Sequence, residues 1–114
     1  MNQEKYLFYA MTGEKMCFQH ILMNALDLSE GGATVRIVLE GRSVTLVPQL
    51  LEEKNPLFAK CRDQGLLAGI CFGCSKVLGV LEANQESGIP LLRDMNGHAS
   101  VRPFTAEGYQ VISI

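Results

Sequence analysis

Strand-like apolar runs alternate with helical patterns along the whole chain, and this alternation constrains the fold more than any other feature. Runs rich in β-branched and aromatic residues are followed by segments in which apolar residues recur with the helical period. Such alternation predicts a mostly parallel sheet with helices on both faces. The strands are expected at residues 4–11, 33–40, 66–70, 89–92 and 109–114.

The clearest helical pattern lies between the first two strands. Apolar side chains recur from Phe18 to Leu28 on one face, Thr12 is placed to cap the start, and Gly31-Gly32 follows the end. Further helices are expected after Ser43, after Asn55-Pro56, over residues 75–85 and from Ser100 to Gly108.

A chain of 114 residues has room for one hydrophobic core, so residues 1–114 are expected to form a single α/β domain with a five-stranded, flavodoxin-like sheet. Hydrophobic residues make up 47% of the sequence and charged residues 19%, a balance that favours folding over disorder. The net charge of -2 and a pI near 5.6 argue against binding to nucleic acid or to an anionic membrane.

The sequence favours a cytoplasmic protein. Its start, "MNQEKYLFYAM", lacks the basic and apolar regions of a signal peptide. The longest apolar runs are about six residues, whereas a membrane span needs about 20. In a reducing compartment, the four cysteines are expected to be buried thiols, metal ligands or reactive groups rather than disulfides.

A ligand site in such a sheet is expected at the carboxyl ends of the strands. Three segments follow strands there: "EGRS" with Glu40 and Arg42, "CFGCS" with Cys71 and Cys74, and "DMNGH" with His98. In a flavodoxin-like order the first and third strands are neighbours, which would also bring Cys17 close to the cysteine pair.

Cys74 is the strongest candidate for chemistry. It is expected where a helix begins, and free backbone N–H groups there would lower its thiol pKa and favour the reactive thiolate. Cys71 lies three residues earlier and is expected to reach Cys74, and Gly73 leaves the approach open. The alternative is that both cysteines are small side chains packed in a tight turn.

Other residues carry weaker hypotheses. Cys17, His20, Cys71 and Cys74 form two pairs with the spacing of zinc ligands. Glu40 is a candidate base. Arg42, with nearby backbone amides, is a candidate anion site, and His98 is a candidate proton donor. The alternative for each of the three is an ordinary turn or surface residue. Cys61 lies on the apolar face of its helix and is expected in the core.

Together these residues resemble the DsrE/DsrF-like family of small α/β proteins, which includes TusD-type sulfur-relay subunits. The resemblance rests on the apolar first strand and long helix, "EGRSVTLV", "GICFGCSKVLGV" and "HASVRPFTAEGYQVISI", and so extends over nearly the whole chain. It implies that Cys74 matches the family's reactive cysteine, which carries sulfur as a persulfide. It also implies sulfur donor and acceptor proteins as partners, and a homo-oligomer such as a trimer or hexamer.

Three functions therefore remain open from the sequence. The first is a sulfur carrier or low-turnover sulfurtransferase, which needs no organic cofactor because thiolate attack on sulfur requires mainly access and a suitable pKa. The second is an oligomeric binding or assembly module with structural cysteines. The third is a zinc-binding or thiol-disulfide redox protein.

Overall fold

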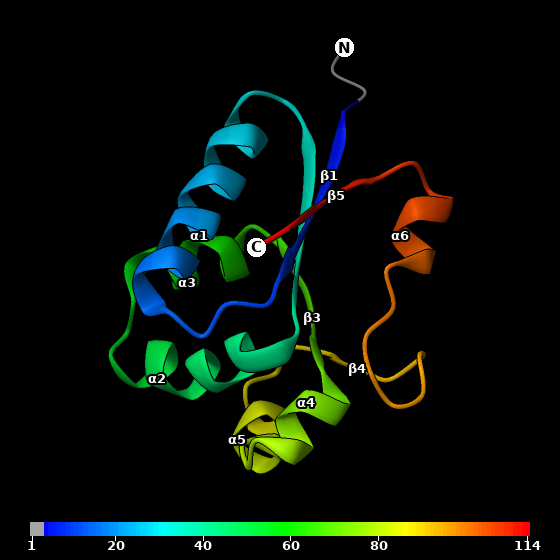
Figure 1. Cartoon of the computed structure of the whole chain (residues 1–114). Helices are drawn as coiled ribbons and strands as arrows, with labels where there is room; N and C mark the ends of the chain where they lie inside the picture. Colours follow the sequence, from blue (N-terminus) through cyan, green and yellow to red (C-terminus); the bar gives the residue numbers. More distant parts are fainter. Residues whose placement is uncertain (1–3) are drawn as a thin grey trace.

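The fold is an all-parallel five-stranded sheet with helices, seen in a computed structural model that describes residues 4–114 (Figure 1). The strands are β1 (Lys5–Ala10), β2 (Thr34–Leu39), β3 (Leu67–Cys71), β4 (Leu91–Leu92) and β5 (Gln110–Ser113). The helices are α1 (Lys15–Glu30), α2 (Leu46–Glu52), α3 (Pro56–Asp63), α4 (Phe72–Val77), α5 (Leu81–Glu86) and α6 (Arg102–Ala106). A 3-10 helix, η1 (Gly41–Thr45), joins β2 to α2.

The strand order is β4-β3-β2-β1-β5, and every neighbouring pair is parallel. The parallel α/β fold expected from the sequence is confirmed. The expectation that the first and third strands are neighbours is wrong, because β2 lies between β1 and β3. The end of β3 therefore lies next to the end of β2 and not next to the loop after β1.

Helices lie on both sides of the sheet, as expected. In Figure 1, α1 and α3 lie on one side of the strands and α6 lies on the other. The Phe18 ring of α1 and the Phe58 ring of α3 are fully buried with centroids 6.4 Å apart, so the two helices pack together as well as on the sheet. All five residues of β3 are buried, which agrees with the continuously apolar sequence of that strand.

Helix boundaries near the sheet edge differ from expectation in ways that matter for the site. Cys71, not Cys74, is the N-cap of α4, and α4 is only six residues long. The helix expected over residues 75–85 is divided into α4 and α5 at Gly79, whose φ of +75° is left-handed. Ser43 does not cap α2; its hydroxyl donates to the carbonyls of Ala10 and Glu40 and ties η1 to β1.

The remaining boundaries shift only slightly. Glu14 is the N-cap of α1, and Thr12 Oγ1 accepts a hydrogen bond from the Glu14 N–H just before the helix. Asn55 caps α3 as expected, because its side-chain oxygen accepts from the Phe58 N–H. The Ser100 hydroxyl oxygen accepts from the Arg102 N–H at the start of α6. The N-cap of α6 is the next residue, Val101.

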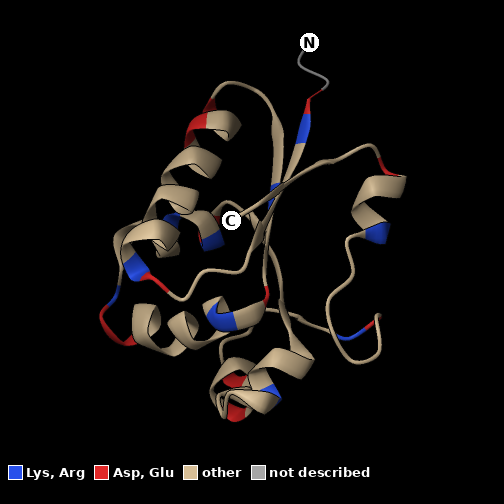
Figure 2. Cartoon of the chain, viewed as in Figure 1, with Lys and Arg blue, Asp and Glu red and all other residues tan. Residues whose placement is uncertain are grey.

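Acidic and basic residues are interspersed over the helices and loops (Figure 2).

Within residues 4–114, no helix combines the length and the apolar character needed to cross a bilayer.

A buried asparagine joins the segments around the end of β3. Asn84 of α5 is completely buried and donates from Nδ2 to the Val44 carbonyl of η1 and to Ser75 Oγ of α4. The Ser75 hydroxyl in turn donates to the Cys71 carbonyl. This chain of hydrogen bonds fixes α4 and η1 relative to each other.

We expect Asn84→Ala to lower the free energy of unfolding by about 1–3 kcal/mol, since it leaves buried hydrogen-bonding groups without a partner. Urea unfolding followed by circular dichroism measures the loss. Asn24→Ala is the matched control, because Asn24 is exposed and its amide donates to the His20 carbonyl of the same helix. If Asn84→Ala lowers the free energy of unfolding by no more than Asn24→Ala does, a structural role for Asn84 is contradicted.

Candidate functional site

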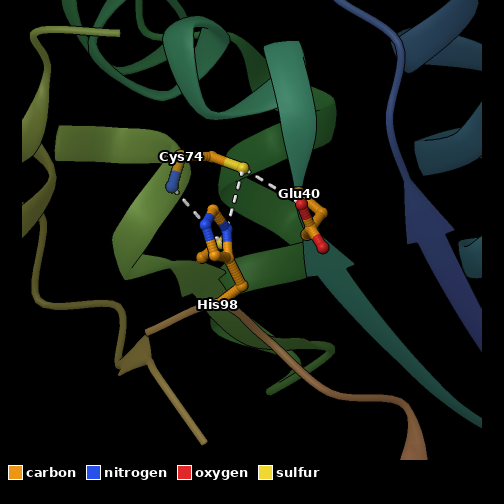
Figure 3. Close-up of side chains that lie close together, drawn as sticks. Glu40, Cys74 and His98 are labelled. Atoms are coloured by element: carbon orange, nitrogen blue, oxygen red, sulfur yellow. Dashed lines mark hydrogen bonds between the residues drawn. The ribbon is translucent and has the colours of Figure 1, made fainter. Parts of the chain in front are cut away.

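Four side chains that can act as acid, base, nucleophile or metal ligand converge at the carboxyl edge of the sheet. They are Glu40, Cys71, Cys74 and His98, and one donor atom from each lies within 4.8 Å of all the others. Figure 3 shows the Glu40 carboxylate, the Cys74 sulfur and the His98 ring pointing toward one another. The sequence placed all four at this edge, and the structure brings them together.

The register of the sheet explains why Glu40 and the cysteines meet. Leu39 of β2 pairs with Ile70 of β3, so the next residues, Glu40 and Cys71, leave neighbouring strands side by side. The chain then turns into η1 on one strand and α4 on the other, and α4 carries Cys74 above the end of the sheet. The loop between β4 and α6 brings in His98.

Cys74 is the thiol that faces the pocket. Its Sγ donates to Glu40 Oε1 at 3.0 Å, accepts from the Gly41 N–H at 3.3 Å and lies 3.5 Å from His98 Nδ1. It is half-buried and lines a hollow of about 200 Å³ together with Arg42, Val77, Leu78 and His98. A small molecule or a partner's side chain that enters this hollow can therefore contact Cys74.

Cys71 lies behind Cys74 and is completely buried. Its Sγ is 3.1 Å from His98 Nδ1 and accepts from the Cys74 N–H at 3.5 Å, which is how it caps α4. The site thus holds one accessible thiol and one enclosed thiol, both beside the same imidazole nitrogen.

Gly73 allows His98 to come this close. A Cβ at Gly73 would lie only 2.6 Å from His98 ring atoms, and the Gly73 N–H donates to the Gly97 carbonyl at 2.7 Å. The sequence suggested that Gly73 leaves a free approach to the thiols. In the structure that space holds the histidine ring instead.

Glu40 is held by β1 and by its own turn. The Tyr9 hydroxyl donates to Glu40 Oε2 and lies 2.9 Å from the Ala99 carbonyl, while the Gly41 N–H donates to Oε1 at 3.1 Å. Only 8% of Glu40 is exposed. Sequence reasoning missed Tyr9; its one signal is a phenol near the carboxyl end of an otherwise apolar strand.

The thiol proton lies on Cys74 rather than on Glu40. Burial, followed by the hydrogen bond to Glu40, raises the pKa of Cys74 to about 12. Burial alone would also raise the pKa of Glu40, but the hydrogen bonds from Cys74, Tyr9 and Gly41 more than offset it and lower that pKa. The expected low thiol pKa is therefore wrong, because burial and the neighbouring Glu40 carboxylate both disfavour the thiolate.

The other predicted site residues are not among these four. Cys17 and His20 are exposed on α1, and within residues 4–114 they join no group of potential metal ligands. Arg42 is exposed at the rim of the hollow, and the Gly41 N–H that was expected to help it hold an anion is already bonded to Glu40 and Cys74. Cys61 is in the core as expected, and burial raises its pKa to about 11.

Comparison with known proteins identifies a relative. The chain is 33% identical over 98 residues to the uncharacterized protein MJ0733 of Methanocaldococcus jannaschii, an alignment that covers 83% of this chain and 78% of the relative. No protein-family model matches the chain, and no solved structure matches it significantly.

The high pKa of Cys74 predicts slow alkylation by iodoacetamide near pH 8, with a rate that keeps rising as the pH approaches 12. Glu40→Gln removes the negative charge beside the sulfur, so it should lower that pKa and speed alkylation at pH 8. Peptide mass spectrometry measures the rate at Cys74, and the exposed Cys17 serves as the internal control. Slower alkylation of Cys74 in the variant would contradict this account of the site.

Proposed function

The chain belongs to the same family as MJ0733, and we propose that it is a sulfur carrier in which Cys74 accepts a sulfane sulfur as a persulfide. The observation that carries the proposal is the position of Cys74: a thiol open to a hollow and hydrogen-bonded to a buried carboxylate at 3.0 Å.

Glu40 helps to raise the pKa of Cys74, and it is also the acceptor toward which the Cys74 proton already points. A thiol must lose its proton to attack sulfur, and the Glu40 carboxylate already accepts that proton in a hydrogen bond. Cys74 Sγ attacks the terminal sulfur of a donor persulfide, R–S–SH, as its proton passes to Glu40. The donor's S–S bond breaks, and the donor leaves as a thiolate that takes up a proton. The products are R–SH and Cys74–S–SH.

Cys71 gives the site a way to release sulfur when no acceptor is present. Its sulfur lies within 4.8 Å of the Cys74 sulfur and can attack the inner sulfur of the persulfide. That step forms a Cys71–Cys74 disulfide and expels the outer sulfur as hydrosulfide, which takes up the proton of Cys71 and leaves as hydrogen sulfide. An external thiol reductant then restores both cysteines.

The resemblance to the DsrE/DsrF-like family supports the same function and extends it. It suggests that the donor and the acceptor of sulfur are proteins and that Cys74 is the persulfide-forming cysteine. A cytoplasmic location is a separate part of the proposal. Arg42 at the rim of the hollow adds a positive charge that favours anionic sulfur species. The chemistry requires no organic cofactor.

Incubation with a sulfurtransferase and thiosulfate should add about 32 Da to Cys74, and a thiol reductant should remove it. We expect Cys71→Ser to accumulate more of this persulfide than the unchanged protein, because the disulfide step is lost. Cys74→Ser should gain no sulfur, whereas Cys17→Ser, which alters an exposed thiol outside the site, should behave as the unchanged protein. Intact-mass and peptide mass spectrometry give both results. Sulfur on Cys17 alone, or on no cysteine, would rule the proposal out.

A homo-oligomer, such as a trimer or hexamer, is the second part of the proposal. A 12.5 kDa chain has a large surface for its volume, and a sequence that is 47% hydrophobic leaves apolar side chains to cover. Sedimentation equilibrium should therefore give a mass of several chains at micromolar concentration. A mass of one chain under these conditions would exclude the oligomer without affecting the sulfur chemistry.

A further inference from the structure

The four side chains of the site form a donor set for a metal ion, and we infer that the reduced protein binds one Zn2+ through Cys71 Sγ, Cys74 Sγ, His98 Nδ1 and one oxygen of Glu40. The zinc ligands suggested by the sequence included the same two cysteines but paired them with Cys17 and His20. The structure replaces that second pair with Glu40 and His98.

The spacing of the donors fits tetrahedral coordination. Zinc bonds of about 2.0–2.3 Å at tetrahedral angles place neighbouring donor atoms roughly 3.3–3.8 Å apart. Cys74 Sγ lies 3.0 Å from Glu40 Oε1 and 3.5 Å from His98 Nδ1, and Cys71 Sγ lies 3.1 Å from the same nitrogen. No pair of donors is more than 4.8 Å apart, so modest side-chain adjustments close the site around one ion.

The donor types select the ion. Two sulfurs and an imidazole nitrogen suit zinc, whereas Mg2+ and Ca2+ prefer sites made entirely of oxygen ligands. Binding replaces the two thiol protons by the metal, so each ion bound releases them to solvent.

Contacts outside the four ligands already hold them in place. The Tyr9 hydroxyl binds Glu40 Oε2, which leaves Oε1 directed at Cys74 and at the centre of the group. The N–H groups of Gly41 and Cys74 donate to the sulfurs of Cys74 and Cys71, respectively, and such bonds stabilise metal-bound thiolates. Tyr9 is therefore a positioning residue for this site.

This inference does not depend on sulfur transfer, since it needs only the four donors. The two activities do compete for the same atoms: zinc draws on the sulfur electrons that Cys74 needs to attack a persulfide, and a Cys71–Cys74 disulfide has no thiolate to give zinc. Zinc-loaded protein is thus expected to take up sulfur more slowly than metal-free protein.

The first experiment titrates the full-length protein, reduced and treated with a chelator, with Co2+ as a spectroscopic probe. We expect thiolate-to-cobalt charge-transfer absorption and the visible bands of a tetrahedral ion, both saturating at one equivalent and both lost when Zn2+ is added. Elemental analysis of protein reloaded with Zn2+ should give the same stoichiometry. Absence of the charge-transfer band, together with substoichiometric zinc, would overturn the inference even if Cys74 accepts sulfur.

Variants then identify the ligands. Cys74→Ser and His98→Ala should each weaken Zn2+ binding by at least about tenfold, and Tyr9→Phe should weaken it by about 10–100-fold while leaving the cobalt spectrum tetrahedral. Cys17→Ser and His20→Ala are the matched controls, since both residues are exposed on α1 outside the site. Circular dichroism checks that each variant folds. Loss of binding in the controls, with retention in Cys74→Ser, would assign the metal elsewhere and refute the proposed ligands.

Discussion

The pairing of β2 with β3 is the constraint on which the site depends. In a parallel sheet all strands end at one edge, and the register that sets Leu39 against Ile70 makes Glu40 and Cys71 neighbours. Every other group of the site is placed from these two residues: η1 continues from Glu40, α4 continues from Cys71, and Gly73 lets the His98 loop dock on α4. A strand inserted between β2 and β3 would separate the carboxylate from both thiols.

A buried carboxylate is costly unless hydrogen-bond donors stabilise its charge. The hydrogen bond from Cys74 to Glu40, with Tyr9 on the far oxygen, keeps the carboxylate charged and the sulfur protonated. This arrangement makes the free thiol unreactive toward ordinary electrophiles. The Cys74 proton nevertheless already points at Glu40, so a reaction that transfers this proton to Glu40 needs no rearrangement of the two side chains.

The sequence predicted the parts of the fold that depend on local pattern, and it could not predict those that depend on strand order. The alternation of strands and helices, the Asn55 cap and the burial of Cys61 all follow from neighbouring residues along the chain. The order of parallel strands does not, since each strand reads as a similar apolar run, and this is why Cys17 was expected too close. The high pKa of Cys74 and the contribution of Tyr9 likewise arise across strands, from β2 and β1.

The same geometry explains why sulfur chemistry and metal binding are both expected at one place. Metal binding uses both thiols, the His98 nitrogen and an oxygen of Glu40. Sulfur transfer uses the Cys74 thiol and the Glu40 carboxylate that accepts its proton, and Cys71 then releases the sulfur. With that proton on Cys74 the site is a thiol pair, and when a metal displaces it the same atoms become four ligands. Because Cys71 is enclosed and Cys74 lines the hollow, a molecule that enters reaches Cys74 before Cys71. The state of this one sulfur, as thiol, persulfide, disulfide or metal ligand, therefore decides which chemistry the site performs.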